Sequence, residues 1–196
     1  MQIVFGTSNP HKVKELNGIV KAYGIKDVEF ILPPEGFDPD ETGTTFEENS
    51  LIKAQEASKI SGMISLADDS GLCVEVLNGE PGIYSARYAE TPQKRIDKLL
   101  AAVAPFENRR AKFVCAMTLT DKDGNVLFAD RGECHGKIAK TQAGTGGFGY
   151  DPIFLVDGKN GLTMAELSEN EKNEVSHRGN ALRKVLKYLS ESSVKS

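Results

Sequence analysis

Short apolar runs alternate along this chain with longer stretches in which apolar residues recur every three or four positions. The apolar run over residues 2–5 predicts a strand, which Gly6 interrupts with a turn. A helix is expected next, because Asn9 is a favourable N-cap, Pro10 suits the first helical position and Gly24 stops an apolar stripe of helical spacing. The chain is therefore expected to begin with strand, turn and helix.

The next part of the chain repeats this alternation around a long polar loop. Residues 28–32 predict a second strand, and residues 33–43 form a loop rich in Pro, Gly, Asp and Glu. A loop of this length in a small domain is often functional. Thr45 and Glu48 have the spacing of a capping box, which opens a helix that ends at Gly62.

The second half of the chain adds strands of the opposite orientation. Residues 63–67 predict a strand that ends directly at Asp68 and Asp69. Asp123-Gly124-Asn125 lies between two alternating runs and predicts an antiparallel hairpin. The other expected elements are a helix over 92–103, hairpin strands over 112–120 and 126–135, a strand over 153–156 and a helix that starts at Ser176. Strands in both orientations with interleaved helices predict an α/β fold, a mixed twisted sheet covered by helices.

Length and charge limit the organisation and the partners of the protein. The 196 residues suit a single domain over 1–196. A formal net charge of −4 argues against a nucleic-acid partner, because such a partner needs a broad basic surface. A small anionic ligand, met by a local group of basic residues and amides, fits the composition better.

Cysteine usage and hydropathy indicate the compartment. Cys73, Cys115 and Cys134 are odd in number and contain no CxxC pair, which predicts reduced thiols. The N-terminus lacks the pattern of an export signal, and no apolar run has the length of a membrane span. We therefore expect a cytoplasmic protein with no membrane partner.

The turn after the first predicted strand has the features of an anion-binding site. A strand that runs into a helix directs unpaired N–H groups and the positive end of the helix dipole at whatever lies above the turn. Lys12 lies in the first helical turn and adds a positive charge. In the alternative interpretation, Asn9 only caps the helix and Lys12 is only solvated. The candidate phosphate-binding residues are Thr7, Ser8, Asn9, Pro10, His11 and Lys12.

Two adjacent carboxylates, Asp68 and Asp69, follow the predicted strand at the position where α/β proteins place ligand sites. Such a pair is electrostatically costly unless a positive charge balances it. Mg²⁺ is a natural balance, because it prefers one or two carboxylates with waters and phosphate oxygens. Glu41 in the acidic loop is a further candidate ligand. The structural alternative is an ordinary Asp-Ser-Gly turn.

The loop from Gly144 to Asp151 formally satisfies the GxGxxG pattern. A dinucleotide-binding fingerprint must open a helix, whereas Pro152 leads into a strand-like run here, so we reject that interpretation. What remains is a flexible loop that offers Phe148 for stacking and Asp151 for hydrogen bonding. The alternative is a core aromatic residue beside a turn Asp.

Basic residues gather near the start of the last predicted helix. His177 and Arg178 can donate hydrogen bonds to oxygens of a base or a phosphate, as can Lys172 a few residues before them. Taken singly, Lys172 and Arg178 are equally consistent with surface charges, and His177 with a residue at the helix cap.

Together these residues closely resemble, nearly end to end, the Ham1/RdgB-type inosine triphosphate pyrophosphatases, which cleanse the nucleotide pool of deaminated purines. The resemblance implies an α/β fold with two lobes around a central substrate cleft, usually a homodimer, that depends on Mg²⁺. The ordered matches are Thr7-x-Asn9-x-x-Lys12, Thr45-Phe46-x-Glu48-Asn49 with Lys53-Ala54, Ala67 to Leu72, Pro81 to Tyr88, Gly144 to Pro152 and Ser176 to Gly179.

The resemblance also implies the reaction, in which ITP, dITP or XTP and water give the monophosphate and pyrophosphate. This hydrolysis keeps deaminated purines out of DNA and RNA. By the same resemblance, Thr7 to Lys12 and Lys53 hold the triphosphate, Glu41 and Asp69 serve the metal with Asp68 beside them, and Asp69 is also the general base. Ser70 lies near the reaction centre, Phe148, Gly149, Tyr150 and Asp151 sandwich and orient the base, and Lys172, His177 and Arg178 read its edge.

The chemistry of the purines suggests how selectivity arises. Hypoxanthine and xanthine carry a 6-oxo acceptor, so a donor such as Lys172 or Arg178 rejects adenine. Guanine shares that edge, so we expect a further donor at C2 to oppose its amine. Two alternatives remain: a pyrophosphatase for another nucleotide, such as a modified pyrimidine, and a noncatalytic nucleotide sensor. The presence of Asp68, Asp69 and Glu41 favours catalysis, because acidic groups beside a polyphosphate do not improve the affinity of a protein that only binds it.

Overall fold

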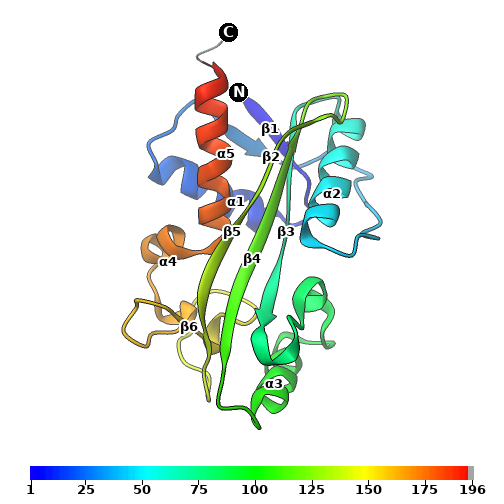
Figure 1. Ribbon diagram of the computed structural model, residues 1–196. Coiled ribbons are helices and arrows are strands. Elements are labelled where there is room, and N and C mark those ends of the chain that lie inside the picture. Colours follow the sequence, from blue (N-terminus) through cyan, green and yellow to red (C-terminus); the bar gives the residue numbers. More distant parts are fainter. Residues whose placement is uncertain (194–196) are drawn as a thin grey trace. The chain divides into compact units, whose positions relative to one another are not determined.

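The computed structural model describes residues 1–193, in which six strands form one mixed sheet in the order β2-β1-β3-β4-β5-β6 (Figure 1). β1 (Gln2–Phe5) pairs in parallel with β2 (Glu29–Ile31) and with β3 (Ser65–Val74). β4 (Arg110–Thr120) and β5 (Val126–Ile138) form the predicted hairpin, and β5 pairs antiparallel with β6 (Phe154–Val156). The α/β fold with a mixed sheet is confirmed. Residues 194–196 of the expected domain lie outside the described part.

Local signals in the sequence place most of the helices correctly. Asn9 caps α1 by accepting a hydrogen bond from the His11 N–H at 2.9 Å. Thr45 caps α2 by accepting from the Glu48 N–H, but the Glu48 carboxylate reaches the Thr44 N–H, so the expected capping box is only half formed. The α-helices are α1 (Pro10–Ala22), α2 (Phe46–Ser61), α3 (Pro92–Val103), α4 (Glu169–Val175) and α5 (His177–Ser193). Short 3₁₀ helices lie at η1 (Glu75–Leu77), η2 (Gly82–Arg87), η3 (Asp151–Ile153) and η4 (Met164–Glu166).

Helix α4 was not expected from the sequence. It has only seven residues, too few to show an apolar stripe, and none of them is fully buried. Its start is nevertheless well defined, because Ser168 and Glu171 form a complete capping box. Lys172 therefore projects from a helix and not from a loop.

The chain divides into two compact units, each with its own apolar core. Unit 1 comprises Met1–Asp69, Cys115–Gly132 and, within the described residues, the chain from Ala181 onward. Unit 2 comprises Ser70–Val114 and Glu133–Asn180.

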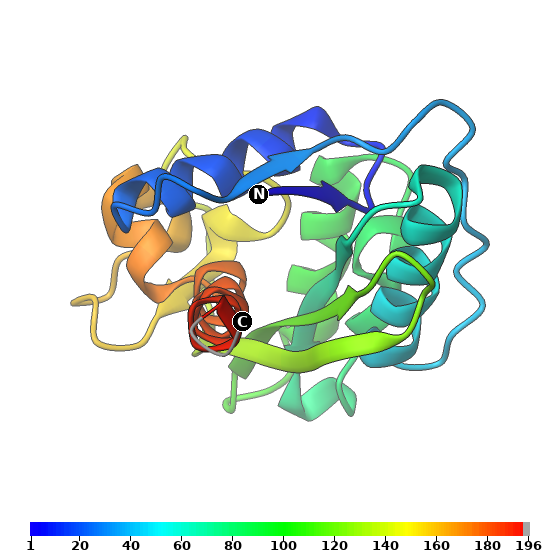
Figure 2. The same ribbon diagram turned by 90° about the horizontal axis from the view of Figure 1, so that it is seen from above.

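In unit 1, helices cover both faces of the strands (Figures 1 and 2). Ile3 and Phe5 of β1 and Met117 of β4 point into the core of unit 1, where Leu16 of α1 and Leu182 of α5 meet them. On the opposite face α2 packs against the strands, and Ala54, Ala57 and Thr118 are buried there. Side chains alternate between the two faces of a strand, which explains why β1 and β4 are buried on both.

Strand β3 is longer than the sequence suggested. Asp68 and Asp69 were expected to follow the strand, but β3 continues through both to Val74. The prediction was wrong because Asp, Ser and Gly are typical turn residues. Lysines from two helices neutralise the carboxylates in this central strand, so the polar residues remain in the sheet. As consecutive strand residues, Asp68 and Asp69 point to opposite faces.

In unit 2 the ends of the long strands pack around aromatic residues. The rings of Phe113 and Phe154 lie 4.6 Å apart, and the β5–β6 pair approaches closely at Gly136. A Cβ at Gly136 would lie 2.1 Å from the Leu155 carbonyl oxygen, so only glycine fits this position. No helix within residues 1–193 has the length and hydropathy that a membrane crossing requires.

The cysteines form no disulfide within the described residues. Cys134 is buried in the core of unit 2. Burial, with smaller effects of Asp157 and Asp151, raises the pKa of the Cys134 thiol to about 12. In the unfolded chain a cysteine thiol has a pKa of about 8.5, so between this pH and pH 12 the native thiol stays protonated while the unfolded one ionises. The contribution of the thiol to stability is therefore full below about pH 8.5 and is lost as the pH rises towards 12.

We expect iodoacetamide at pH 8.5 to alkylate Cys134 roughly a thousandfold more slowly in the native protein than in urea, because only the thiolate reacts. Mass spectrometry of peptides from timed samples measures both rates in the same chain. Similar rates in the two states would contradict the burial of this thiol.

Candidate active site

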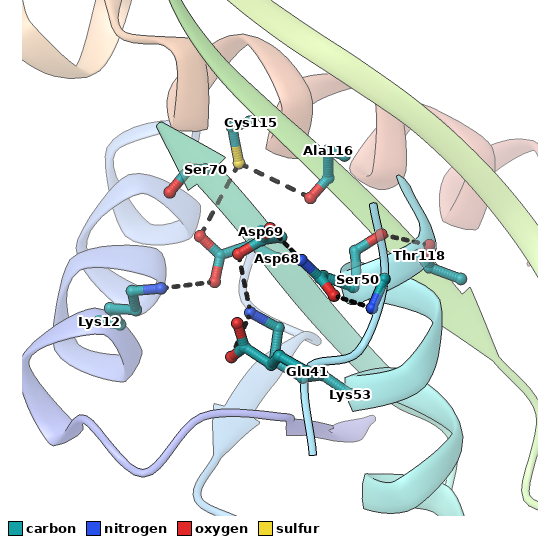
Figure 3. A network of polar contacts seen from close by, with 12 residues as sticks. Lys12, Glu41, Ser50, Lys53, Asp68, Asp69, Ser70, Cys115, Ala116 and Thr118 are labelled. Atoms are coloured by element: carbon teal, nitrogen blue, oxygen red, sulfur yellow. Dashed lines mark hydrogen bonds and ion pairs between the residues drawn. The ribbon is translucent and has the colours of Figure 1, made fainter. Parts of the chain in front are cut away.

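Five charged residues of unit 1, which we call the acidic cluster, lie together at the middle of β3 (Figure 3). Three are carboxylates and two are ammonium groups. Helices α1 and α2 each supply one lysine, β3 supplies two carboxylates and the loop before α2 supplies the third. The members are Lys12, Glu41, Lys53, Asp68 and Asp69.

Asp68 is held on the face of the sheet that α1 covers. Its Oδ1 accepts a hydrogen bond from Lys12 Nζ at 2.9 Å, and only 1% of the residue is exposed. The Sγ of Cys115 lies 3.9 Å from Asp68 Oδ2. The negative charge of Asp68 is thus balanced by a lysine from the helix that starts at the N-terminal turn.

Asp69 is held on the opposite face by residues of α2. Lys53 Nζ lies 3.1 Å from Asp69 Oδ1 and 3.2 Å from Glu41 Oε1, so one ammonium group bridges two carboxylates (Figure 3). Lys53 is 7% exposed and Asp69 is 9% exposed. The adjacent carboxylates thus have separate counter-ions, whereas the sequence suggested a shared one.

Burial and charge shift two pKa values in this cluster. Burial raises the pKa of Asp69, and attraction by Lys53 offsets this only in part. For Lys53, burial favours the neutral amine, but the charges of Asp68, Asp69 and Glu41 outweigh burial and raise its pKa. Asp69 is thus a carboxylate whose proton affinity is greater than usual, beside a lysine that stays charged.

Asn49 is a member of this site that the sequence did not single out as functional. It is 1% exposed, and its Nδ2 donates to Asp69 Oδ2 at 3.2 Å. Its Oδ1 accepts from the Gly43 N–H at 2.9 Å, which ties the loop that carries Glu41 to the strand that carries Asp69. A Cβ at Gly43 would lie 2.6 Å from this oxygen. The only signal in the sequence was its place in the motif after Thr45.

We expect Asn49→Ala to lower the free energy of unfolding by about 1–3 kcal/mol, because it removes the acceptor of the part-buried Gly43 N–H and one of the donors to the buried Asp69. Urea unfolding measures the change. Gln55→Ala is the matched control, since Gln55 lies on the same helix and its hydrogen bond to Gly124 is exposed. A loss no larger than that of the control would refute the role of Asn49.

The carboxylates of the cluster suit a divalent metal that a ligand helps to bind. Within residues 1–193, no group of three or more His, Cys, Asp or Glu side chains forms a complete metal site. Glu41 and Asp69 nevertheless place one oxygen each around a single cation, the Lys53 ammonium. Mg²⁺ commonly takes one or two carboxylates and completes its shell with water and phosphate oxygens. The residues therefore fit a divalent metal ion bound together with a phosphate ligand.

The N-terminal turn has the conformation that the sequence predicted. Thr7 is buried, and its Oγ1 accepts from the Asn9 N–H at 3.1 Å. Ser8, Asn9, Pro10 and His11 are exposed at the start of α1. Lys12 joins this turn to Asp68, so the structure brings the turn and the acidic cluster together.

In unit 2, four of the predicted site residues contact one another, and we call them the Phe148 cluster. The Phe148 ring is 57% exposed, with Lys172 Nζ at 4.9 Å and Arg178 Cζ at 5.9 Å from its centre. Asp151 Oδ2 accepts from Lys172 Nζ at 2.6 Å and from the Phe148 N–H at 3.0 Å. An exposed aromatic residue with two cationic groups over its ring can stack a planar ring and bind its oxygens. The members are Phe148, Asp151, Lys172 and Arg178.

The other predicted residues of unit 2 lie around this cluster. Arg178 is 2% exposed, and its guanidinium lies 3.4 Å from Ser70 Oγ. His177 stacks on Phe113 with ring centres 4.8 Å apart. The ring of Tyr150 is buried, and its hydroxyl donates to the Ser85 carbonyl at 2.9 Å. Gly149 adopts a left-handed φ of 60° between Phe148 and Tyr150.

Phe113 contacts His177 and Ser85 contacts Tyr150, but neither Phe113 nor Ser85 was identified from the sequence. They are far from the loop in sequence, and apolar or small residues of this kind carry no chemical signal of their own. Ser85 did lie in the matched stretch from Pro81 to Tyr88, which sequence reasoning had left without a role.

Comparisons with known proteins identify relatives of this chain. A model of the Ham1 family matches residues 3–188. A protein from Prochlorococcus marinus strain NATL1A named dITP/XTP pyrophosphatase is 44% identical over 187 residues, which cover 95% of this chain and 93% of that one. A protein of the same name from an Exiguobacterium strain is 46% identical over 189 residues, covering 94% and 95%. The solved structure of the Staphylococcus aureus Ham1 protein has a TM-score of 0.87 at 40% identity, covering 98% of this chain and 100% of that one. The resemblance found in the motifs is confirmed, and the chain belongs to the Ham1 family.

Proposed function

We propose that this protein hydrolyses deaminated purine nucleoside triphosphates, namely ITP, dITP and XTP, to the monophosphate and pyrophosphate, and so cleanses the nucleotide pool. The observation that carries the proposal is the chain of contacts from Glu41 through Lys53 to Asp69, which places two carboxylates, one of them buried, beside a cation that can bind phosphate. The names of the relatives, dITP/XTP pyrophosphatase, support the choice of substrate.

In this proposal unit 1 binds the triphosphate. The backbone N–H groups of the turn from Thr7 to Lys12 and the positive end of α1 attract phosphate oxygens. Lys12 and Lys53 supply two positive charges close to this turn. Glu41 and Asp69, with Asp68 beside them, supply the carboxylates that serve the metal.

The same residues provide the means to activate water. When bound, Mg²⁺ would neutralise charge on the phosphates and orient the pyrophosphate that leaves. Asp69 accepts a proton from the attacking water, and the raised pKa of its carboxylate improves it as a base near neutral pH. The oxygen of that water forms a bond to phosphorus, the bond to the bridging oxygen breaks, and the bonding electrons leave with pyrophosphate. The family expectation is attack at the α-phosphorus.

Unit 2 recognises the base in this proposal. Phe148 stacks on the purine, and Asp151 fixes the backbone of Phe148 and the ammonium of Lys172 together. Lys172 or Arg178 donates to the 6-oxo group, which adenine lacks. His177 lies beside Arg178 at the start of α5 and is the candidate for the C2 side, where guanine must be rejected.

The experiment that tests the proposal measures pyrophosphate and orthophosphate released from ITP, XTP, dITP, GTP and ATP, with Mg²⁺ and with a chelator. We expect pyrophosphate from ITP, dITP and XTP alone, and none with the chelator. Orthophosphate as the product, indifference to the base, or binding without turnover would each contradict the proposal. The first two results would indicate a different nucleotide hydrolase, and the third would indicate a sensor.

The family resemblance also supports a homodimer that acts in the cytoplasm, and we include both in the proposal. Sedimentation equilibrium of the purified protein tests the first, and fractionation of cells tests the second.

A further inference from the structure

We propose that Lys53 is the counter-ion of the metal-binding carboxylates in the metal-free protein, so that a divalent cation binds weakly alone and binds tightly only with the nucleotide. The inference rests on the proposed function for the identity of the nucleotide, but not for the role of the lysine. In the metal-free protein the Lys53 ammonium pairs with the carboxylates, and when the metal and the nucleotide bind it pairs with the phosphates instead.

The geometry of the three groups is the first support. Lys53 Nζ contacts Asp69 Oδ1 at 3.1 Å and Glu41 Oε1 at 3.2 Å. Mg²⁺ binds oxygen ligands at about 2.0–2.1 Å and would use the same two carboxylates. A metal ion and the ammonium therefore compete for one place. Figure 3 shows Lys53 between the two acidic side chains.

The charges give the second support. Glu41 and Asp69 carry two negative charges, of which Lys53 neutralises one. Asp68 adds a third negative charge, which Lys12 balances at 2.9 Å. A bare divalent ion thus meets one net negative charge and a cation already in contact with its ligands. A metal–nucleotide complex brings phosphates that accept the displaced ammonium.

The enclosure of the lysine gives the third support. Lys53 is 7% exposed, and its ammonium is held between Asp69 and Glu41. The flexible four-carbon stem allows its head to move while its backbone stays in α2.

Binding of Mn²⁺ alone to the nucleotide-free protein tests the inference directly, with the free ion measured by electron paramagnetic resonance. We expect Lys53→Met to bind Mn²⁺ about tenfold more tightly than the wild type, or better, because the competing charge is gone. Lys59→Met is the matched control, since Lys59 is an exposed lysine of the same helix, paired with Glu56 at 3.7 Å. It should bind Mn²⁺ like the wild type. Equal or weaker binding by Lys53→Met would overturn the inference.

Loss of Lys53 leaves Asp69 buried beside another carboxylate, so the variant is less stable without metal. Thermal unfolding of Lys53→Gln therefore serves as a second measurement. Mn²⁺ should raise the Tm of this variant more than the Tm of the wild type, and an equal or smaller rise would contradict the role of Lys53.

Neither measurement uses turnover, so the two proposals can fail separately. Tighter Mn²⁺ binding by the variant, together with no pyrophosphate release by the wild type, would keep the counter-ion and reject the proposed function. Pyrophosphate release by the wild type, together with unchanged Mn²⁺ binding by the variant, would do the reverse.

Discussion

Asp69→Asn is expected to lower the rate of pyrophosphate release from ITP by about 10³-fold, because it removes both the proposed base and a charged metal ligand. The amide keeps the shape of the side chain. It also removes a carboxylate whose burial raises its pKa, so the ionised form is costly in the fold. We therefore expect the variant to fold and to retain most of its stability. Steady-state assays of pyrophosphate at saturating ITP measure the effect.

Asp97→Asn provides the comparison for this substitution. Asp97 is exposed on α3 and accepts a hydrogen bond from Gln93 at 2.8 Å, so its loss should leave the rate unchanged within about twofold. If Asp69→Asn kept a tenth or more of the wild-type rate while folded, Asp69 would not be the base.

The second large effect is expected at Gly147, where Ala should lower kcat/KM for ITP by about 10- to 100-fold. A Cβ at this position would lie 2.1 Å from Asp151 Oδ2 and 2.9 Å from Lys172 Nζ. These are the atoms that hold Phe148 and the proposed donor to the base. Displacement of binding groups by about 1 Å can reduce rates by this amount. Assays across a range of ITP concentrations measure the change.

Gly149→Ala separates this contact from backbone strain. Both glycines have positive φ, 74° at Gly147 and 60° at Gly149, so Ala costs about 1–2 kcal/mol at either position. No atom lies within 4 Å of a Cβ at Gly149. We expect both variants to lose stability through backbone strain but only Gly147→Ala to lose most of its activity. Equal kcat/KM values would show that the close contact is unimportant.

Local signals explain which parts of the fold the sequence could predict. The caps at Asn9 and Thr45 act over two or three residues, and both helices start where the sequence placed them. The hairpin strands β4 and β5 have a typical turn between them, and the second half of β5 alternates between buried and more exposed residues. Helix α4 was missed because its seven residues carry no apolar stripe.

Long-range contacts explain what the sequence could not predict. Asp69 remains inside a strand because Lys53, 16 residues away, neutralises it. Asn49 joins Gly43 to Asp69, which lies 20 residues further along the chain than Asn49. Nothing in the sequence around Asn49 requires this contact. Most candidate residues came from local patterns in the sequence, and the family resemblance assigned their roles, which stay predictions until the variants are measured. The pairing of each carboxylate with its own lysine depended on the tertiary structure.

The position of Asp68 and Asp69 within a paired strand also limits how the gene can change. Parallel pairing of Val4 with Ser65 and of Phe5 with Leu66 fixes the register of β3 three residues before Asp69. Insertion or deletion of one codon in that interval would turn each carboxylate to the opposite face. Asp68 would then lie on the side of Lys53 and Asp69 on the side of Lys12, with both ion pairs broken at once. Natural variation in length should therefore collect in loops such as residues 33–43 and avoid this short interval.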